Sequence, residues 1–245
     1  FAVAALEKDM QWEIESAKTK NGFVYTNLAD NTVEILKYTG TESNVTIPDK
    51  IDNKVVKTLG AESFTENETV VGVTIPAQVT NLQYGAFASC TDLKKVTFAQ
   101  GSQLKKIKEE TFEHCQKLEE IHIPDSVTQI EKGAFYYCRS LSKLTLGKKL
   151  EVIDNNAFEG CSSLKQIEIP DSVESIGEGA FTYCTSLEHV TIGNKLAYVA
   201  KSAFSWCNLT EITWGDGIAK IGDSAFACNQ KLTTVPIPDT VTELE

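Results

Sequence analysis

An internal repeat of about 23 residues constrains the fold of this chain more than any other feature of its sequence. A phenylalanine marks each unit, and the copies are Phe64, Phe87, Phe112, Phe135, Phe158, Phe181, Phe204 and Phe226. An alternating apolar pair recurs once per unit, from Val73 and Ile75 to Val235 and Ile237. Because one unit is too small to bury its own apolar face, the units must stack into a solenoid with a continuous core.

Each unit predicts the same sequence of local structures. Leu118–Ile123 alternates apolar and polar residues and ends at Pro124, which is typical of a short strand with one buried face. The second apolar pair, Val127 and Ile130, predicts a shorter ladder on the opposite side. Phe135, Cys138 and Leu141 then follow at intervals of three, which favours a 3₁₀ or helical turn with one face inward.

The two ends depart from the repeat. We expect residues 1–40 to form an N-terminal cap and residues 41–245 to form about eight units, with the array truncated at its C-terminus. Gly22–Thr26 and Thr32–Tyr38 predict two strands joined by a turn. Val45–Pro48 resembles half a unit, although the return from it to Leu59 is longer than in the other units.

The first residues of the cap allow two interpretations. Leu6, Met10 and Ile14 are spaced to lie on one face of a short helix, and a strand around Trp12–Ile14 is the alternative.

The net charge of the chain argues against nucleic acid as a partner. Acidic residues number 34 against 23 basic ones, and the net charge of −11 disfavours binding to nucleic acid. The basic run from Lys105 to Lys108 is followed by Glu109 and Glu110, which predicts a solvated face and no binding site. No apolar run is long enough to span a membrane.

All seven cysteines follow the repeat, which makes a metal site or a disulfide framework a poor interpretation. They are Cys90, Cys115, Cys138, Cys161, Cys184, Cys207 and Cys228, and no pair has the Cys-x-x-Cys spacing. Stacked units place these thiols in one column, where parallel side chains do not point at each other. We therefore predict a structural ladder of buried free thiols, with disulfides between neighbours as the alternative.

The sequence contains no recognisable catalytic or cofactor motif. The three histidines, His114, His122 and His189, form no His-x-x-x-His pair, and a Ser-His-Asp site would need residues from several units to converge. No glycine-rich phosphate loop is present. We expect no catalysis, no cofactor and no metal.

The repeat resembles the BspA-like subfamily of leucine-rich repeats. The segments that carry the resemblance are Leu118–Ile130 and Gly133–Cys138, which the next two units nearly repeat. The resemblance covers about residues 40–245. It implies a leucine-rich repeat solenoid of the α/β type, with a parallel sheet on the concave face. It also implies a secreted or cell-surface protein that acts in adhesion and protein binding.

Within that fold, the residues between the buried strand positions project from the concave sheet. They form the partner-binding face that we predict: Lys95, Thr97, Glu120, His122, Lys143, Thr145, Gln166, Glu168, His189, Thr191 and Glu211. The mixture of charged, amide and imidazole groups suits a protein ligand, such as a host matrix or surface protein. Threonine also suits an exposed strand that binds nothing, and that alternative stays open.

A row of aromatic residues two positions after the repeat phenylalanine is a second candidate. It consists of His114, Tyr137, Tyr183 and Trp206, and Gly160 interrupts it. Exposed aromatic side chains are enriched at interfaces, but these side chains would equally serve to cover the core. Two other functions also stay open. The array would be a passive spacer that displays other domains, or an enzyme with a site assembled across repeats.

Overall fold

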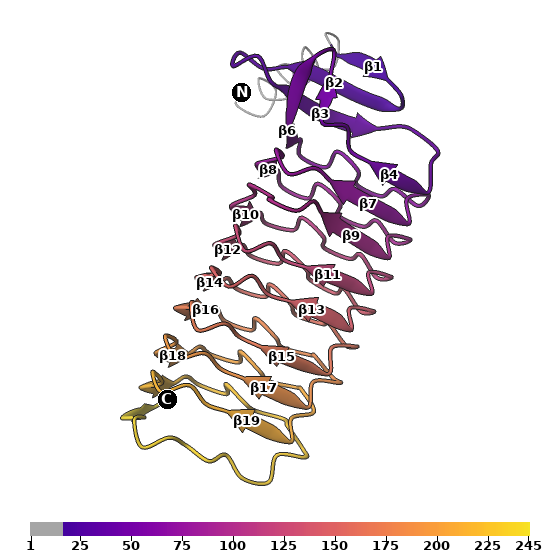
Figure 1. Ribbon diagram of the computed structural model, residues 1–245. Coiled ribbons are helices and arrows are strands. Elements are labelled where there is room, and N and C mark those ends of the chain that lie inside the picture. Colours follow the sequence, from indigo (N-terminus) through magenta and orange to yellow (C-terminus); the bar gives the residue numbers. More distant parts are fainter. Residues whose placement is uncertain (1–16) are drawn as a thin grey trace, which may run out of the picture.

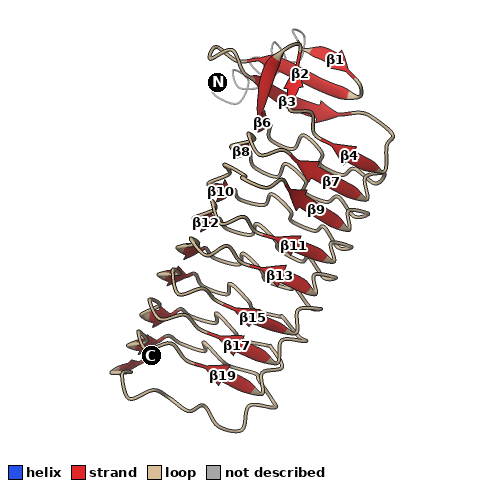
Figure 2. Ribbon diagram, in the orientation of Figure 1, coloured by secondary structure: helices blue, strands red, loops and turns tan. Residues whose placement is uncertain are grey.

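The computed structural model describes residues 17–245 and forms a β-solenoid of about nine turns. The turns follow one another along a nearly straight axis, with strands on two sides (Figures 1 and 2). No helix occurs among the described residues, so the helical parts of the predicted fold class are wrong for this part of the chain. The helix or strand predicted around Leu6–Ile14 lies outside the described residues.

The N-terminal sheet is built on the predicted hairpin. Its strands are β1 (Lys18–Lys20), β2 (Phe23–Asn27), β3 (Val33–Tyr38), β6 (Lys54–Leu59) and β5 (Lys50–Ile51), in that spatial order. Strands β2 and β3 pair antiparallel, which confirms the prediction. Strand β3 then pairs in parallel with β6, so the hairpin of the cap continues into the solenoid through this sheet. The longer return to Leu59 is the antiparallel β5–β6 hairpin.

The longer strands form the sheet predicted as concave, which we call the long-strand sheet. Its strands are β4 (Asn44–Thr46), β7 (Gly72–Ile75), β9 (Lys95–Phe98), β11 (Glu120–His122), β13 (Lys143–Thr145), β15 (Gln166–Glu168), β17 (His189–Thr191) and β19 (Glu211–Thr213). All pairings in it are parallel, and β4 pairs with β7 as the half unit predicts. Pairing is interrupted between β13 and β15.

The second apolar pair of each unit forms the predicted shorter ladder. Its strands are β8 (Asn81–Leu82), β10 (Lys106–Ile107), β12 (Gln129–Ile130), β14 (Val152–Ile153), β16 (Ser175–Ile176), β18 (Tyr198–Val199), β20 (Lys220–Ile221) and β21 (Glu243–Leu244). The strands from β10 to β21 form one parallel ladder, whereas β8 pairs with β6 of the N-terminal sheet. The strand predicted at Val235 and Ile237 is absent, because Pro236 between them has no N–H for the ladder.

A column of stacked phenylalanine rings fills the core. Neighbouring rings from Phe64 to Phe226 are stacked with centroids 4.8–5.6 Å apart, close to the ~4.8 Å between adjacent strands. Tyr38 and Phe23 extend the column into the cap, with the Tyr38 ring 5.1 Å from that of Phe64. The rings from Phe64 to Phe204 are at most 1% exposed, so each contributes about 1.5–3 kcal/mol in transfer terms.

The segment around each phenylalanine is a series of turns and not a helix. Alternate N–H groups bond within the unit and to the next unit: Tyr136 N–H donates to Gly133, whereas Phe135 N–H donates to Ala157. The residues two before and two after Phe135, Gly133 and Tyr137, have φ of 60° and 55°. A left-handed residue every fourth position interrupts a right-handed helix, and half of the donors are used between units.

Six of the seven cysteines form the predicted column. They are free and buried, and each thiol donates a hydrogen bond to the carbonyl of the phenylalanine one unit earlier, as from Cys115 to Phe87 at 3.1 Å. The same bond recurs from Cys90 to Cys207. Burial raises the pKa of the Cys115, Cys138, Cys161 and Cys184 thiols well above the usual range, which makes them poor nucleophiles.

Cys228 is not part of this column, contrary to the prediction. It is exposed and has φ of 59°, and it corresponds in the last unit to Trp206. Asn229 takes the place of the buried cysteine. Its side-chain amide donates to the Phe204 carbonyl at 2.9 Å, and its side-chain oxygen accepts from Leu209 N–H at 3.0 Å. The column cysteines lie three residues after their phenylalanine, and Asn229, not Cys228, has that spacing from Phe226.

This arrangement predicts the outcome of native alkylation. With iodoacetamide at neutral pH, Cys228 is expected to react and the six buried thiols to stay unmodified until the protein is unfolded, because buried thiols ionise poorly. Mass spectrometry of the intact and digested protein measures the number and position of the adducts. A Cys228→Ser variant provides the control and should take up no label when folded. Labelling of the column in the folded protein, or disulfides within it, would contradict the ladder.

Candidate functional site

The predicted partner-binding residues lie on the outer face of the long-strand sheet. Strand alternation buries Ile121 and Ile167 and leaves their neighbours Glu120, His122, Gln166 and Glu168 exposed. Parallel register aligns equivalent residues in columns across the strands, as with Lys95, Glu120 and Lys143 in one row. The geometry thus brings the predicted residues onto one continuous surface, which we call the strand face. Whether that surface binds a partner stays a prediction.

Few interactions tie these side chains to each other. Lys95 Nζ lies 3.8 Å from Glu120 Oε2, and His189 Nδ1 lies 3.6 Å from Glu211 Oε2. Exposed pairs of this kind contribute at most about 1 kcal/mol. Within residues 17–245, the side chains of Lys143, Gln166 and Glu168 have no hydrogen bond or ion pair. The strand face therefore leaves most of its polar groups free for a ligand.

A groove of about 590 Å³ opens where the long-strand sheet is interrupted. It lies between β13 and β15, and its lining includes Thr145, Gln166 and Glu168 of the predicted face. Leu144 also lines it and is partly exposed, whereas Ile121 and Ile167 at the equivalent positions are at most 3% exposed. At this inward position, every other strand of the long-strand sheet has valine or isoleucine, and only β13 has leucine. Valine and isoleucine are β-branched, and β-branched side chains pack better in strands.

The aromatic row has a covered part and an exposed part. The Tyr137 ring lies against Gly160, where an added Cβ would be 3.0 Å from it, and Arg139 lies 5.2 Å from the centre of the same ring. Tyr183 and Trp206 are 41% and 51% exposed and stack with ring centres 5.7 Å apart. The covered part of the row therefore matches the core-covering interpretation, and the exposed pair of Tyr183 and Trp206 stays a candidate interface.

An acidic hollow of about 360 Å³ lies beside the covered part of the row. Glu110, Glu113 and Glu159 line it together with Tyr136 and with Lys132, whose ammonium lies 3.6 Å from the Glu109 carboxylate. Burial raises the pKa of Glu113, and the neighbouring Glu110 raises it further; burial also raises the pKa of Glu159. The carboxylates and the aromatic ring would favour a positively charged side chain of a partner.

The described residues contain no recognisable reactive centre. Within residues 17–245, no group of three histidine, cysteine, aspartate or glutamate side chains is placed to hold a metal ion. His189 contacts Glu211 but no serine hydroxyl. In the same part of the chain, no helix is long and apolar enough to cross a membrane.

The chain belongs to the family of BspA type leucine rich repeat regions. The model of that family matches residues 34–165 and 151–245, in agreement with the resemblance of the sequence. A search of curated proteins gave no match.

Solved structures of bacterial proteins share the fold. The leucine rich repeat protein of T. pallidum (TpLRR) is 26% identical over 91% of this chain and 92% of its own, with a TM-score of 0.61. A leucine rich cell surface protein from Faecalibacterium prausnitzii A2-165 is 27% identical, over 94% of this chain and 84% of its own, with a TM-score of 0.57. The pneumococcal vaccine antigen PcpA, 22% identical over 95% of this chain and 78% of its own, has a TM-score of 0.64 and supports the fold alone.

Proposed function

We propose that this chain is the protein-binding part of a secreted or cell-surface protein that acts in adhesion and has no catalytic activity. The single observation that carries the proposal is the groove between β13 and β15, which combines free polar groups with the partly exposed Leu144. Binding surfaces commonly pair an apolar centre with a polar rim. Membership of the family is consistent with a protein-binding role, and the F. prausnitzii relative is described as a cell surface protein.

The proposed ligand is a protein of the host matrix or of a cell surface. The strand face offers carboxylate, amide, imidazole and ammonium groups in ordered columns, and ordered columns on a rigid sheet suit an extended protein surface. The exposed pair of Tyr183 and Trp206 is the second candidate surface, because tyrosine and tryptophan dominate the energetics of many interfaces.

Binding to immobilised collagen, laminin and fibronectin tests the proposal. A variant with Glu120, His122, Gln166 and Glu168 changed to alanine is expected to lose at least about tenfold in affinity for the matrix protein that the native chain binds. A control variant with Glu151, Glu174 and Lys195 changed to alanine, on the short-strand side, should bind like the native protein. Surface plasmon resonance measures both, and circular dichroism checks that both variants fold.

The alternatives give different results in the same assay. If affinity is unchanged in the strand-face variant but lost in a variant with Tyr183 and Trp206 changed to serine, the aromatic row is the binding surface. If the native chain binds no protein of the panel and none from a wider set of surface proteins, a passive spacer is the better description.

A further inference from the structure

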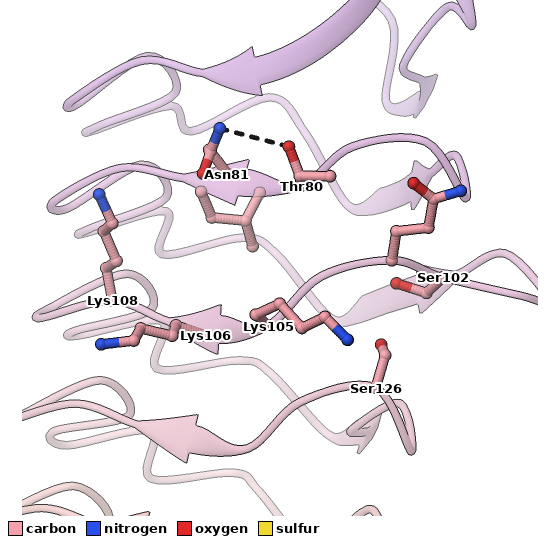
Figure 3. A pocket seen from close by; sticks show the side chains of 9 residues that line it. Thr80, Asn81, Ser102, Lys105, Lys106, Lys108 and Ser126 are labelled. Atoms are coloured by element: carbon pink, nitrogen blue, oxygen red, sulfur yellow. Dashed lines mark hydrogen bonds between the residues drawn. The ribbon is translucent and has the colours of Figure 1, made fainter.

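The repeat is irregular at one place, and a pocket of about 650 Å³ lies there (Figure 3). The unit from Phe87 to Phe112 is two residues longer than its neighbours, and Gly101 in the longer segment has φ of 77° with open space around it. The short-strand ladder is interrupted at the same point, because β8 pairs with β6 and the ladder proper starts at β10. The extra residues therefore separate two coils and create the pocket between β8 and β10.

The lining of this pocket is basic, although the protein as a whole is acidic. It consists of Thr80, Asn81, Leu82, Ser102, Gln103, Lys105, Lys106, Lys108 and Ser126. Three of these residues are lysines and none is acidic, in a chain whose net charge is −11. The sequence predicted only a solvated face for the run from Lys105 to Lys108. In the structure all three lysines of the run also line one pocket. Such a lining favours an anion.

Two hydrogen-bond donors in the pocket have no partner among residues 17–245. The Ser126 hydroxyl is buried without a hydrogen bond, which is costly for a polar group. The Lys105 ammonium has no carboxylate or other acceptor, and it points toward Ser126 in Figure 3. The other two lysines are already engaged, since Lys106 lies 3.4 Å from Glu131 and Lys108 donates to Gln83.

We propose that this pocket binds the phosphate or sulfate ester group of a small hydroxyl-rich molecule. The ammonium of Lys105 and the hydroxyl of Ser126 donate to the ester oxygens, and charge-assisted hydrogen bonds of this kind are the stronger ones. Asn81, Gln103 and Thr80 line the rest of the pocket, and the Asn81 amide donates to the Thr80 hydroxyl at 3.3 Å, which leaves that hydroxyl's own proton for the ligand (Figure 3). The volume is within the range of about 300–1,000 Å³ typical of small-molecule pockets and exceeds the needs of a bare phosphate ion.

Isothermal titration at low ionic strength tests the proposal with four probes: glucose 6-phosphate, glucose 6-sulfate, inorganic phosphate and glucose. Both esters are expected to bind saturably and glucose is not. Inorganic phosphate should bind more weakly than glucose 6-phosphate, because it leaves the neutral polar groups unoccupied. Added salt should weaken binding by screening the charge. Tighter binding of inorganic phosphate than of either ester would restrict the site to the free anion and overturn the proposed ligand.

Substitutions in the pocket and elsewhere distinguish a specific binding site from general attraction to charge. Lys105→Gln is expected to weaken binding of glucose 6-phosphate by about tenfold, the loss of one charge-assisted bond. The matched control Lys149→Gln removes the same charge from an exposed lysine elsewhere and should leave affinity unchanged. Ser126→Ala removes a hydroxyl that has no partner in the free protein, so it should weaken binding without lowering the unfolding temperature.

Three results would overturn the proposal. The first is the absence of saturable binding of either ester up to about 10 mM, which is weaker than most specific sites. The second is equal loss of affinity in Lys105→Gln and Lys149→Gln, which would indicate general charge attraction. The third is unchanged binding in Ser126→Ala together with unchanged binding in Lys105→Gln, which would place the ligand elsewhere.

Discussion

Replacing Phe135 with alanine is expected to lower the free energy of unfolding by about 3–5 kcal/mol. The ring is fully buried and stacks between those of Phe112 and Phe158, at centroid distances of 5.1 and 5.0 Å. Its removal leaves a cavity in the middle of the column and weakens the coil interfaces on both sides. In a solenoid, where each unit contacts only its neighbours, such a defect should also divide unfolding into two transitions. Urea titration followed by circular dichroism measures both effects.

Tyr183→Ala provides the matched control for this variant. It removes an aromatic ring from the same type of turn, but the ring is 41% exposed and leaves no closed cavity. We expect a loss of less than about 1 kcal/mol and a single transition, as for most exposed positions. Similar losses in the two variants would show that the buried ring column is not the main source of stability.

Gly193→Ala is expected to destabilise the protein by about 2–3 kcal/mol, because the added methyl group has no room. An ideal Cβ on Gly193 would lie 2.4 Å from the carbonyl oxygen of Pro170 and 2.7 Å from the amide nitrogen of Asp171. Both atoms belong to the backbone of the preceding coil, so no side-chain rotation relieves the contact. The two coils must separate at the edge of the long-strand sheet, next to the bond from Ile169 N–H to Thr191.

Gly101→Ala separates this packing effect from the general effect of replacing a glycine. Gly101 has φ of 77°, and no atom lies within 4 Å of the position of an added Cβ. The expected loss is about 1–2 kcal/mol from backbone strain alone. Differential scanning calorimetry on both variants gives the comparison. Gly193→Ala with a smaller loss than Gly101→Ala would contradict the close approach of the coils.

The repeat residues determine most of the fold, and the sequence predicted that part correctly. Phe135 and Cys138 recur at fixed positions, and identical units that stack must place identical side chains in columns. Alternation around Ile121 predicted which strand residues are buried and which form the strand face. These inferences succeeded because burial and periodicity are properties of every unit.

The turn conformation could not be deduced from the apolar spacing. Residues at i, i+3 and i+6 lie on one side of a helix, but they also lie inward in a series of turns interrupted by left-handed residues. Gly85, Gly133 and Gly179 share one of the left-handed positions, and that recurrence of glycine was the available signal. The other units place Glu62, Glu110 or a polar residue there, which obscured it.

The groove beside β13 and the pocket between β8 and β10 arise where units differ from each other, so the likeness between units did not predict them. The long unit after Phe87 was visible in the sequence, but not that its extra residues would separate β8 from β10. Leu144 in place of a β-branched residue gave only a weak indication of the groove beside β13. Cys228 lies two residues after Phe226 and not three, so it takes the left-handed turn position of Trp206, and Asn229 takes the place in the column.

The hydrogen bonds between coils run along the axis of the stack, and this direction has a mechanical consequence. A force that pulls on both ends of the array acts along those bonds and loads them one coil at a time, as in opening a zipper. Each coil that detaches releases about 23 residues and lengthens the chain by about 75 Å. The array would therefore yield in small, repeated steps, and each step would dissipate the energy of one coil interface while the remaining coils stay folded.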